Sequence, residues 1–137
     1  MARNFVAVII GLTVAGAIVW TIEMANYNMH PLPPGLDVTD KEAMTEYIKT
    51  LPAMAYVMVV LAHIFGSIGG AWVASIVAAS HERKISIGIG LFLLVMGAIN
   101  LLMIPHPAWF MVIDLLVYIP GALLGYSFYN MRKTKNV

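Results

Sequence analysis

Four long stretches of the chain contain almost no charged residues, and this feature restricts the fold more than any other. They cover about residues 5–24, 52–80, 85–104 and 107–130. A transmembrane helix needs roughly 20 apolar residues to cross about 30 Å of hydrocarbon, and each stretch is long enough. The sequence therefore predicts an all-α integral membrane protein, an antiparallel four-transmembrane-helix bundle with a short outer amphipathic helix.

The composition excludes several other classes of protein. Of 137 residues, 61% are hydrophobic and 11% are charged, whereas soluble domains carry about 25% charged residues. A soluble enzyme, a nucleic-acid-binding protein and a disordered chain are all excluded. The absence of cysteine excludes disulfides, thiolate zinc sites and cysteine nucleophiles. Residues 1–137 are expected to form a single membrane domain.

The first apolar stretch could also be interpreted as a signal peptide. It is too long for the apolar region of a signal peptide, and residues 23–27 lack the small side chains of a cleavage site. We therefore expect it to be retained as a membrane span.

The distribution of basic residues predicts the orientation. They concentrate at the two termini and in the connection between the second and third spans: Arg3, Arg83, Lys84, Arg132, Lys133 and Lys135. Basic segments stay in the cytoplasm. The expected location is the bacterial inner (plasma) membrane, multi-pass, with both the N-terminus and the C-terminus cytoplasmic.

Residues 25–51 form the expected outer loop. Pro31, Pro33 and Pro34 exclude a helix at its start, and Gly35 suits a turn. Thr39 and Glu42 then match a capping box, with Thr39 as the N-cap of an amphipathic helix. We expect this helix to lie at the outer interface, either over the bundle or on the lipid.

Each span carries one polar residue in its outer half: Glu23, His63, Asn100 and Asp114. At 1.5 Å per residue, their depths overlap within roughly 10–15 Å. Ionisable groups inside spans are costly and mark candidate functional sites. These four residues are therefore the predicted binding or proton-titrating cluster.

Small residues indicate which helix faces meet. Glycines expected at helix–helix contacts share a side with the polar residues: Gly66, Gly70, Gly97, Gly121 and Gly125. In the first span, Glu23 aligns with Gly16, Thr13 and Trp20. The polar cluster should consequently face the interior of the bundle.

Two interpretations of the cluster remain open. It could be a structural network in which Asp114 accepts a hydrogen bond from His63 and Asn100 bridges them. It could instead be a proton-titrating site or a ligand pocket that opens outward. The histidines of the outer loops, His30 and His106, could fold over it. No metal and no cofactor are predicted, because His63 is the only histidine deep in a span.

Three segments carry a resemblance to a protein family. They are Pro31–Asp37 (PLPPGLD), before the amphipathic helix, the glycine-rich stretch His63–Trp72, and Ile104–Asp114, in which Ile-Pro-His-Pro precedes Trp109, Phe110 and Asp114. In these segments the chain resembles uncharacterised small bacterial four-transmembrane-helix proteins. The resemblance covers nearly the whole chain and implies the four-span fold, without implying an activity.

Three functions are compatible with the sequence. Because no complete catalytic set is present, the first is a non-enzymatic interaction protein, a homo-oligomer or an accessory subunit of a larger membrane complex. The second is a small-solute or proton-coupled transporter that uses His63 and Asp114. The third is a membrane enzyme that acts on a lipid or isoprenoid, with His63 as general base. The expected partners are the lipid bilayer and a lipid or small-molecule ligand, and no nucleic acid.

Overall fold

The computed structural model describes residues 1–104 and 106–135. Within these residues the chain forms five α-helices and no β-strand: α1 (Ala2–Met29), α2 (Lys41–Thr50), α3 (Ala53–Val77), α4 (Glu82–Met103) and α5 (Ala108–Lys135). All except α2 are long and apolar enough to cross a membrane. The chain is thus all-helical, with four candidate spans.

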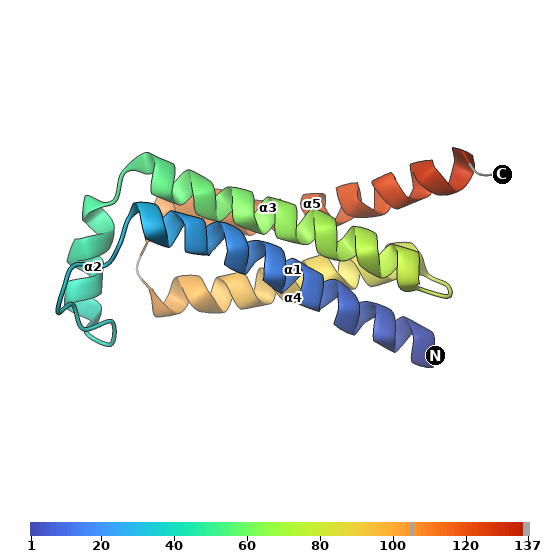
Figure 1. Cartoon of the computed structure of the whole chain (residues 1–137), viewed down its shortest axis with the longest axis horizontal. Helices are drawn as coiled ribbons and strands as arrows, with labels where there is room; N and C mark the ends of the chain where they lie inside the picture. Colours follow the sequence, from blue (N-terminus) through green and yellow to red (C-terminus); the bar gives the residue numbers. More distant parts are fainter. Residues whose placement is uncertain (105, 136–137) are drawn as a thin grey trace.

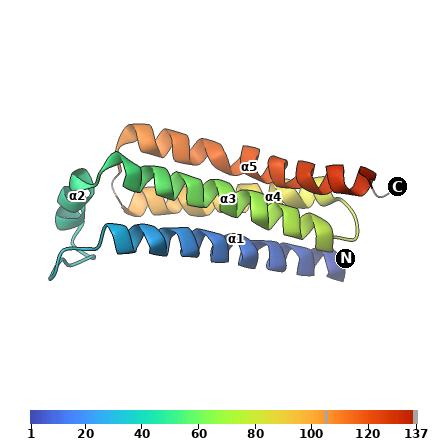
Figure 2. The same ribbon diagram turned by 45° about the horizontal axis from the view of Figure 1, so that its top comes forward.

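The four long helices run side by side, and α2 lies across one end of them (Figure 1). The N-terminus and the C-terminus both lie at the opposite end. In Figure 2, α1 and α5 flank α3 on opposite sides. Helix α1 packs mainly along α3 and contacts α4 only weakly, whereas α5 contacts both α3 and α4.

The helices differ from the predicted spans mainly at their ends. Helix α1 continues to Met29 instead of ending near residue 24, and Asn26 in its added turn donates a hydrogen bond to the Ala55 carbonyl. Helix α3 ends at Val77 instead of residue 80. There, the Asn4 side chain accepts a 2.9 Å hydrogen bond from the Ala79 backbone. These contacts between distant residues leave no signal in local hydropathy.

Helices α1 and α3 approach closely along a stripe of small residues. A Cβ atom added to Gly70 would lie 2.7 Å from both the Gly11 carbonyl oxygen and the Ala15 Cβ. The predicted contact face of α1 is wrong in part, because Trp20 is 63% exposed and Thr13 is also exposed. Gly11 and Ala15 form the contact instead, since only such small side chains allow this distance.

The other predicted packing glycines also lie against neighbouring helices. A Cβ on Gly66 would meet Val19 and the Ala15 carbonyl of α1. On α5, Gly121 faces Ser67, and Gly125 faces the α3 backbone. On α4, Gly97 leaves the space that the Tyr118 ring occupies. Glycine therefore permits close contacts between helices and also makes room for a buried aromatic side chain.

The short helix α2 begins one residue later than the capping box predicts. Its N-cap is Asp40, whose side chain accepts hydrogen bonds from the backbone of Glu42 and Ala43 at 2.9 and 3.1 Å. The prediction of Thr39 as N-cap is wrong, because Thr39 donates through its side chain and backbone to Asp37. These hydrogen bonds, first that from the Thr39 side chain, lower the pKa of Asp37.

Helix α2 lies over the bundle. Its Ile48 packs in a buried cluster with Tyr56 of α3, Leu101 of α4 and Phe110 of α5. The Tyr56 hydroxyl donates a 2.5 Å hydrogen bond to the Ile48 carbonyl. The side chains of α2 consequently cover one end each of α3, α4 and α5.

Candidate functional site

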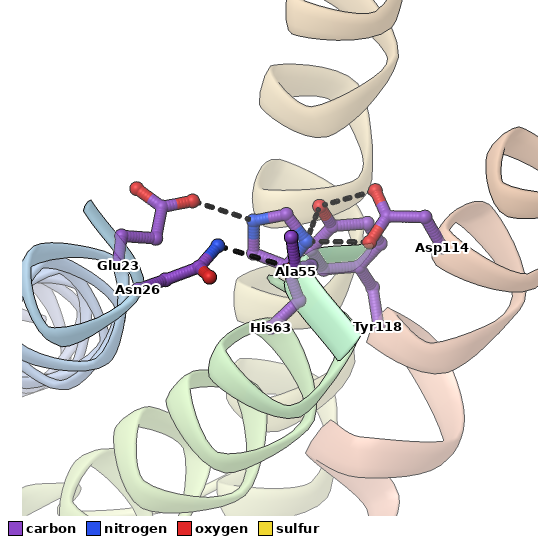
Figure 3. Close-up of polar contacts among 6 residues, drawn as sticks. All are labelled: Glu23, Asn26, Ala55, His63, Asp114 and Tyr118. Atoms are coloured by element: carbon purple, nitrogen blue, oxygen red, sulfur yellow. Dashed lines mark hydrogen bonds and ion pairs between the residues drawn. The ribbon is translucent and has the colours of Figure 1, made fainter. Parts of the chain in front are cut away.

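His63 of α3 is the centre of a row of polar side chains that come from α1, α3 and α5 (Figure 3). Its Nδ1 lies 2.6 Å from Oδ1 of Asp114 on α5. The Asp114 side chain is 1% exposed, and that of His63 is 13% exposed. A carboxylate buried to this degree needs hydrogen-bond donors, and Nδ1–H of His63 is well placed as one.

Tyr118 completes this contact from the next turn of α5. Its hydroxyl donates to Asp114 Oδ2 at 3.3 Å and lies 2.9 Å from His63 Nδ1. Both oxygens of Asp114 therefore have a partner. This arrangement fixes the orientation of the imidazole and directs Nε2 away from α5, toward α1.

Glu23 of α1 lies on the other side of the imidazole. Its Oε1 is 3.7 Å from His63 Nε2, a distance that allows an ion pair when His63 is protonated. The Glu23 side chain is 43% exposed. The two carboxyl groups thus lie at opposite nitrogens of one ring and do not converge on a common point. Consistent with this, the described residues contain no cluster of three His, Asp or Glu side chains able to hold a metal ion.

A cavity of about 470 Å³ adjoins Glu23 and His63. Its walls come from α1 and α4, and His63 and Tyr118 contribute from α3 and α5. The lining residues are Gly16, Val19, Glu23, His63, Leu93, Met96, Gly97, Ile99, Asn100, Met103, Ile104 and Tyr118. The cavity is therefore mostly apolar, with its polar groups gathered at one place.

This cavity opens sideways from the bundle. Helices α1 and α4 barely contact each other. Met96 and Met103 line the cavity and yet are 50% and 71% exposed. An opening between two spans would face lipid rather than water if these helices cross a bilayer.

A second, much smaller cavity of about 20 Å³ lies on the other side of the cluster. It touches Asp114, His63, Asn100 and His106. A polar cavity needs about 10–15 Å³ to hold one water molecule, so this space is sufficient. Burial lowers the pKa of His106, while its hydrogen bond with the Ile104 carbonyl and the charge of Asp114 act in the opposite direction.

The structure brings together some of the predicted residues and separates others. Glu23, His63 and Asp114 form the row, and His106 reaches it through the small cavity. His30 does not join them, because its Nδ1 is bonded to Asn26 at the end of α1.

The predicted bridging role of Asn100 is wrong. Asn100 is exposed and lines both cavities, and among the described residues no hydrogen bond joins it to His63 or Asp114. Tyr118 occupies the bridging position instead. The sequence does contain a signal for it, because residues four apart on a helix share a face and Tyr118 follows Asp114 by four.

The arrangement combines a fixed imidazole with an adjoining apolar space. Asp114 and Tyr118 hold the Nδ1 edge of His63, and its Nε2 faces Glu23 at the cavity. Comparisons with protein-family models, with curated proteins and with solved structures gave no match to this chain.

Proposed function

We propose that this protein binds a small amphipathic molecule in the cavity between α1 and α4. The ligand's polar group would contact Glu23 and His63, and its apolar part would lie along the walls. The observation that carries the proposal is the position of the Glu23–His63 pair at the polar end of a cavity of about 470 Å³. Small-molecule sites are typically apolar cavities of about 300–1,000 Å³ with a few convergent polar groups.

The proposal includes the location predicted from the sequence. The protein would span the bacterial inner membrane four times, with both termini in the cytoplasm, so that the cavity lies in the outer leaflet. A ligand would then enter from the lipid through the opening between α1 and α4. The distribution of basic residues supports this orientation, because they concentrate at the end of the bundle that carries the termini.

The interaction-protein hypothesis stays a prediction, since it concerns contacts with other chains. A proton-coupled carrier and a lipid-modifying enzyme also stay predictions. Both require a ligand at this site as their first step, so a binding experiment comes before either.

The test uses photolabelling with a filled-cavity variant. A Cβ at Gly16 would meet no atom within 4 Å, and Gly16 lines the cavity, so Gly16→Phe should occupy it without disturbing the fold. Gly88→Phe is a matched control, because Gly88 is equally open but lies outside the cavity lining. The probe is an alkanol that carries a photoreactive diazirine, applied to protein in lipid nanodiscs.

We expect saturable labelling of peptides that contain Val19 and Met96, and competition by unlabelled decanol. Gly16→Phe should remove most of this saturable labelling, and Gly88→Phe should retain it. Labelling that is spread evenly over all four long helices, and that Gly16→Phe leaves unchanged, contradicts the proposed function.

A further inference from the structure

The row of polar side chains beside the cavity has more acidic than basic groups. Two carboxyl groups, Glu23 and Asp114, flank one imidazole, that of His63. With both carboxyl groups ionised, the row keeps one negative charge even when His63 is protonated. Among the residues that the structure describes, no Lys or Arg lines the cavity. A negative charge in a low-dielectric site needs a compensating cation.

The uncompensated charge belongs to Glu23. Asp114 is 1% exposed, and both of its oxygens have partners in His63 and Tyr118. Glu23 is 43% exposed, lines the cavity and lies 3.7 Å from His63 Nε2, beyond hydrogen-bond distance. A cation that enters the cavity would therefore meet the Glu23 carboxylate rather than Asp114.

The remaining walls fit an apolar body. Val19, Leu93, Met96 and Met103 line the cavity beyond Glu23. Methionine side chains are flexible and adapt to ligands of different shape. Asn100 also lines the cavity, and its amide oxygen is an uncharged hydrogen-bond acceptor.

We propose that the ligand class of this site is a lipophilic amine: one protonated amino group on an apolar body. The ammonium group pairs with Glu23, and the apolar body lies against the methionines of α4. This inference rests on the proposed function, since it specifies the charge of the molecule that the cavity binds.

Competition with protons follows from the same geometry. The titratable groups around Glu23 are His63 on α3 and Asp114 and Tyr118 on α5, and α4 contributes the uncharged Asn100. Protonation of Glu23, or of His63 beside it, removes part of the attraction for an ammonium ion. Amine binding should accordingly weaken as the pH falls.

Three probes with the same apolar chain test the charge preference: decylamine, decanol and decanoate. Their binding to protein in phosphatidylcholine nanodiscs is measured by equilibrium dialysis at pH 7, and binding to empty nanodiscs is subtracted. We expect decylamine to bind at least tenfold more tightly than either other probe. Glu23→Gln should remove most of this tenfold preference for decylamine over decanol and decanoate.

Two further variants make the experiment specific. Glu42→Gln removes one negative charge from the exposed helix α2 and should leave all three affinities unchanged. Glu23→Asp retains the charge and should preserve the preference for decylamine. Equal affinity of wild-type protein for the three probes overturns the amine inference and leaves the proposed function intact. An amine preference that survives in folded Glu23→Gln overturns it as well. If none of the probes binds, both proposals fail.

Discussion

Asp114 is the residue at which the buried polar contacts of the site converge. Its carboxylate accepts hydrogen bonds from His63 of α3 and from Tyr118, one turn further along its own helix. A buried carboxylate with two donors holds its neighbours in fixed positions, because losing either donor leaves an unpaired charge in an apolar environment. The position of the imidazole beside the cavity thus depends on Tyr118, which also lines the cavity, and on Asp114, which does not.

Removing the Tyr118 hydroxyl tests this dependence. Tyr118→Phe keeps the ring that fills the space beside Gly97 but leaves Asp114 Oδ2 without its donor. We expect a loss of about 0.5–1.5 kcal/mol in unfolding free energy, the usual net contribution of one hydrogen bond. The measurement is thermal unfolding in mild detergent. Tyr27→Phe, at an exposed tyrosine of α1, should be neutral. Equal stability of the two variants would contradict the role of the hydroxyl.

The sequence predicts part of this site from residue positions alone. His63 and Asp114 have similar depths and lie on small-residue faces, which is sufficient to expect them in contact. The sequence does not show whether Asn100 or Tyr118 is the bridging residue, because the rotation of each helix about its axis decides which side chain faces the cluster. In the structure Asn100 is exposed, and the Tyr118 ring takes the space that Gly97 leaves open.

The contact between α1 and α3 is so close that backbone atoms limit the distance between the two helices. Gly11 and Gly70 lie against each other across it. In contrast, α1 barely contacts α4, and the cavity occupies the space between them. The position of α1 is therefore determined mainly by its contact with α3. One hydrogen bond near each end of α1 supports it: Asn4 accepts from the Ala79 backbone, and Asn26 donates to the Ala55 carbonyl.

A methyl group at Gly70 tests this contact. A Cβ there would lie 2.7 Å from the Gly11 carbonyl, and a backbone atom cannot move aside as a side chain can. We expect Gly70→Ala to cost about 1–3 kcal/mol, as for other overpacked positions. Gly88→Ala, where a Cβ meets no atom within 4 Å, should be neutral or slightly stabilising. Thermal unfolding in detergent compares them, and equal melting temperatures would contradict the tight contact.

At the scale of elements, hydropathy predicts the four long helices and places their centres correctly. Their ends are less predictable, because polar side chains from distant segments decide them, as Asn4 does for the end of α3. The start of α2 differs from the predicted start by one residue for a related reason. Both Thr39 and Asp40 can cap a helix, and the neighbouring Asp37 binds Thr39 and leaves Asp40 for the helix.

The whole molecule has distinct ends. Both termini and the connection between α3 and α4 lie at one end, and α2 covers the other. The absence of cysteine allows the proposed orientation to be tested with single introduced thiols. Lys41→Cys on α2 should react with a membrane-impermeant maleimide in intact cells. Lys84→Cys should react only after the membrane is permeabilised, and the opposite pattern would contradict the cytoplasmic position of the termini.

The sideways opening between α1 and α4 has a consequence for how affinity is measured. If the ligand reaches the cavity from the bilayer, occupancy follows its mole fraction in lipid and not its concentration in water. Two amines with equal affinity for the site would then differ in apparent dissociation constant by the ratio of their partition coefficients. A longer alkyl chain would look like a better ligand even where it makes no added contact with the protein, and increasing the lipid-to-protein ratio at fixed total ligand would lower occupancy.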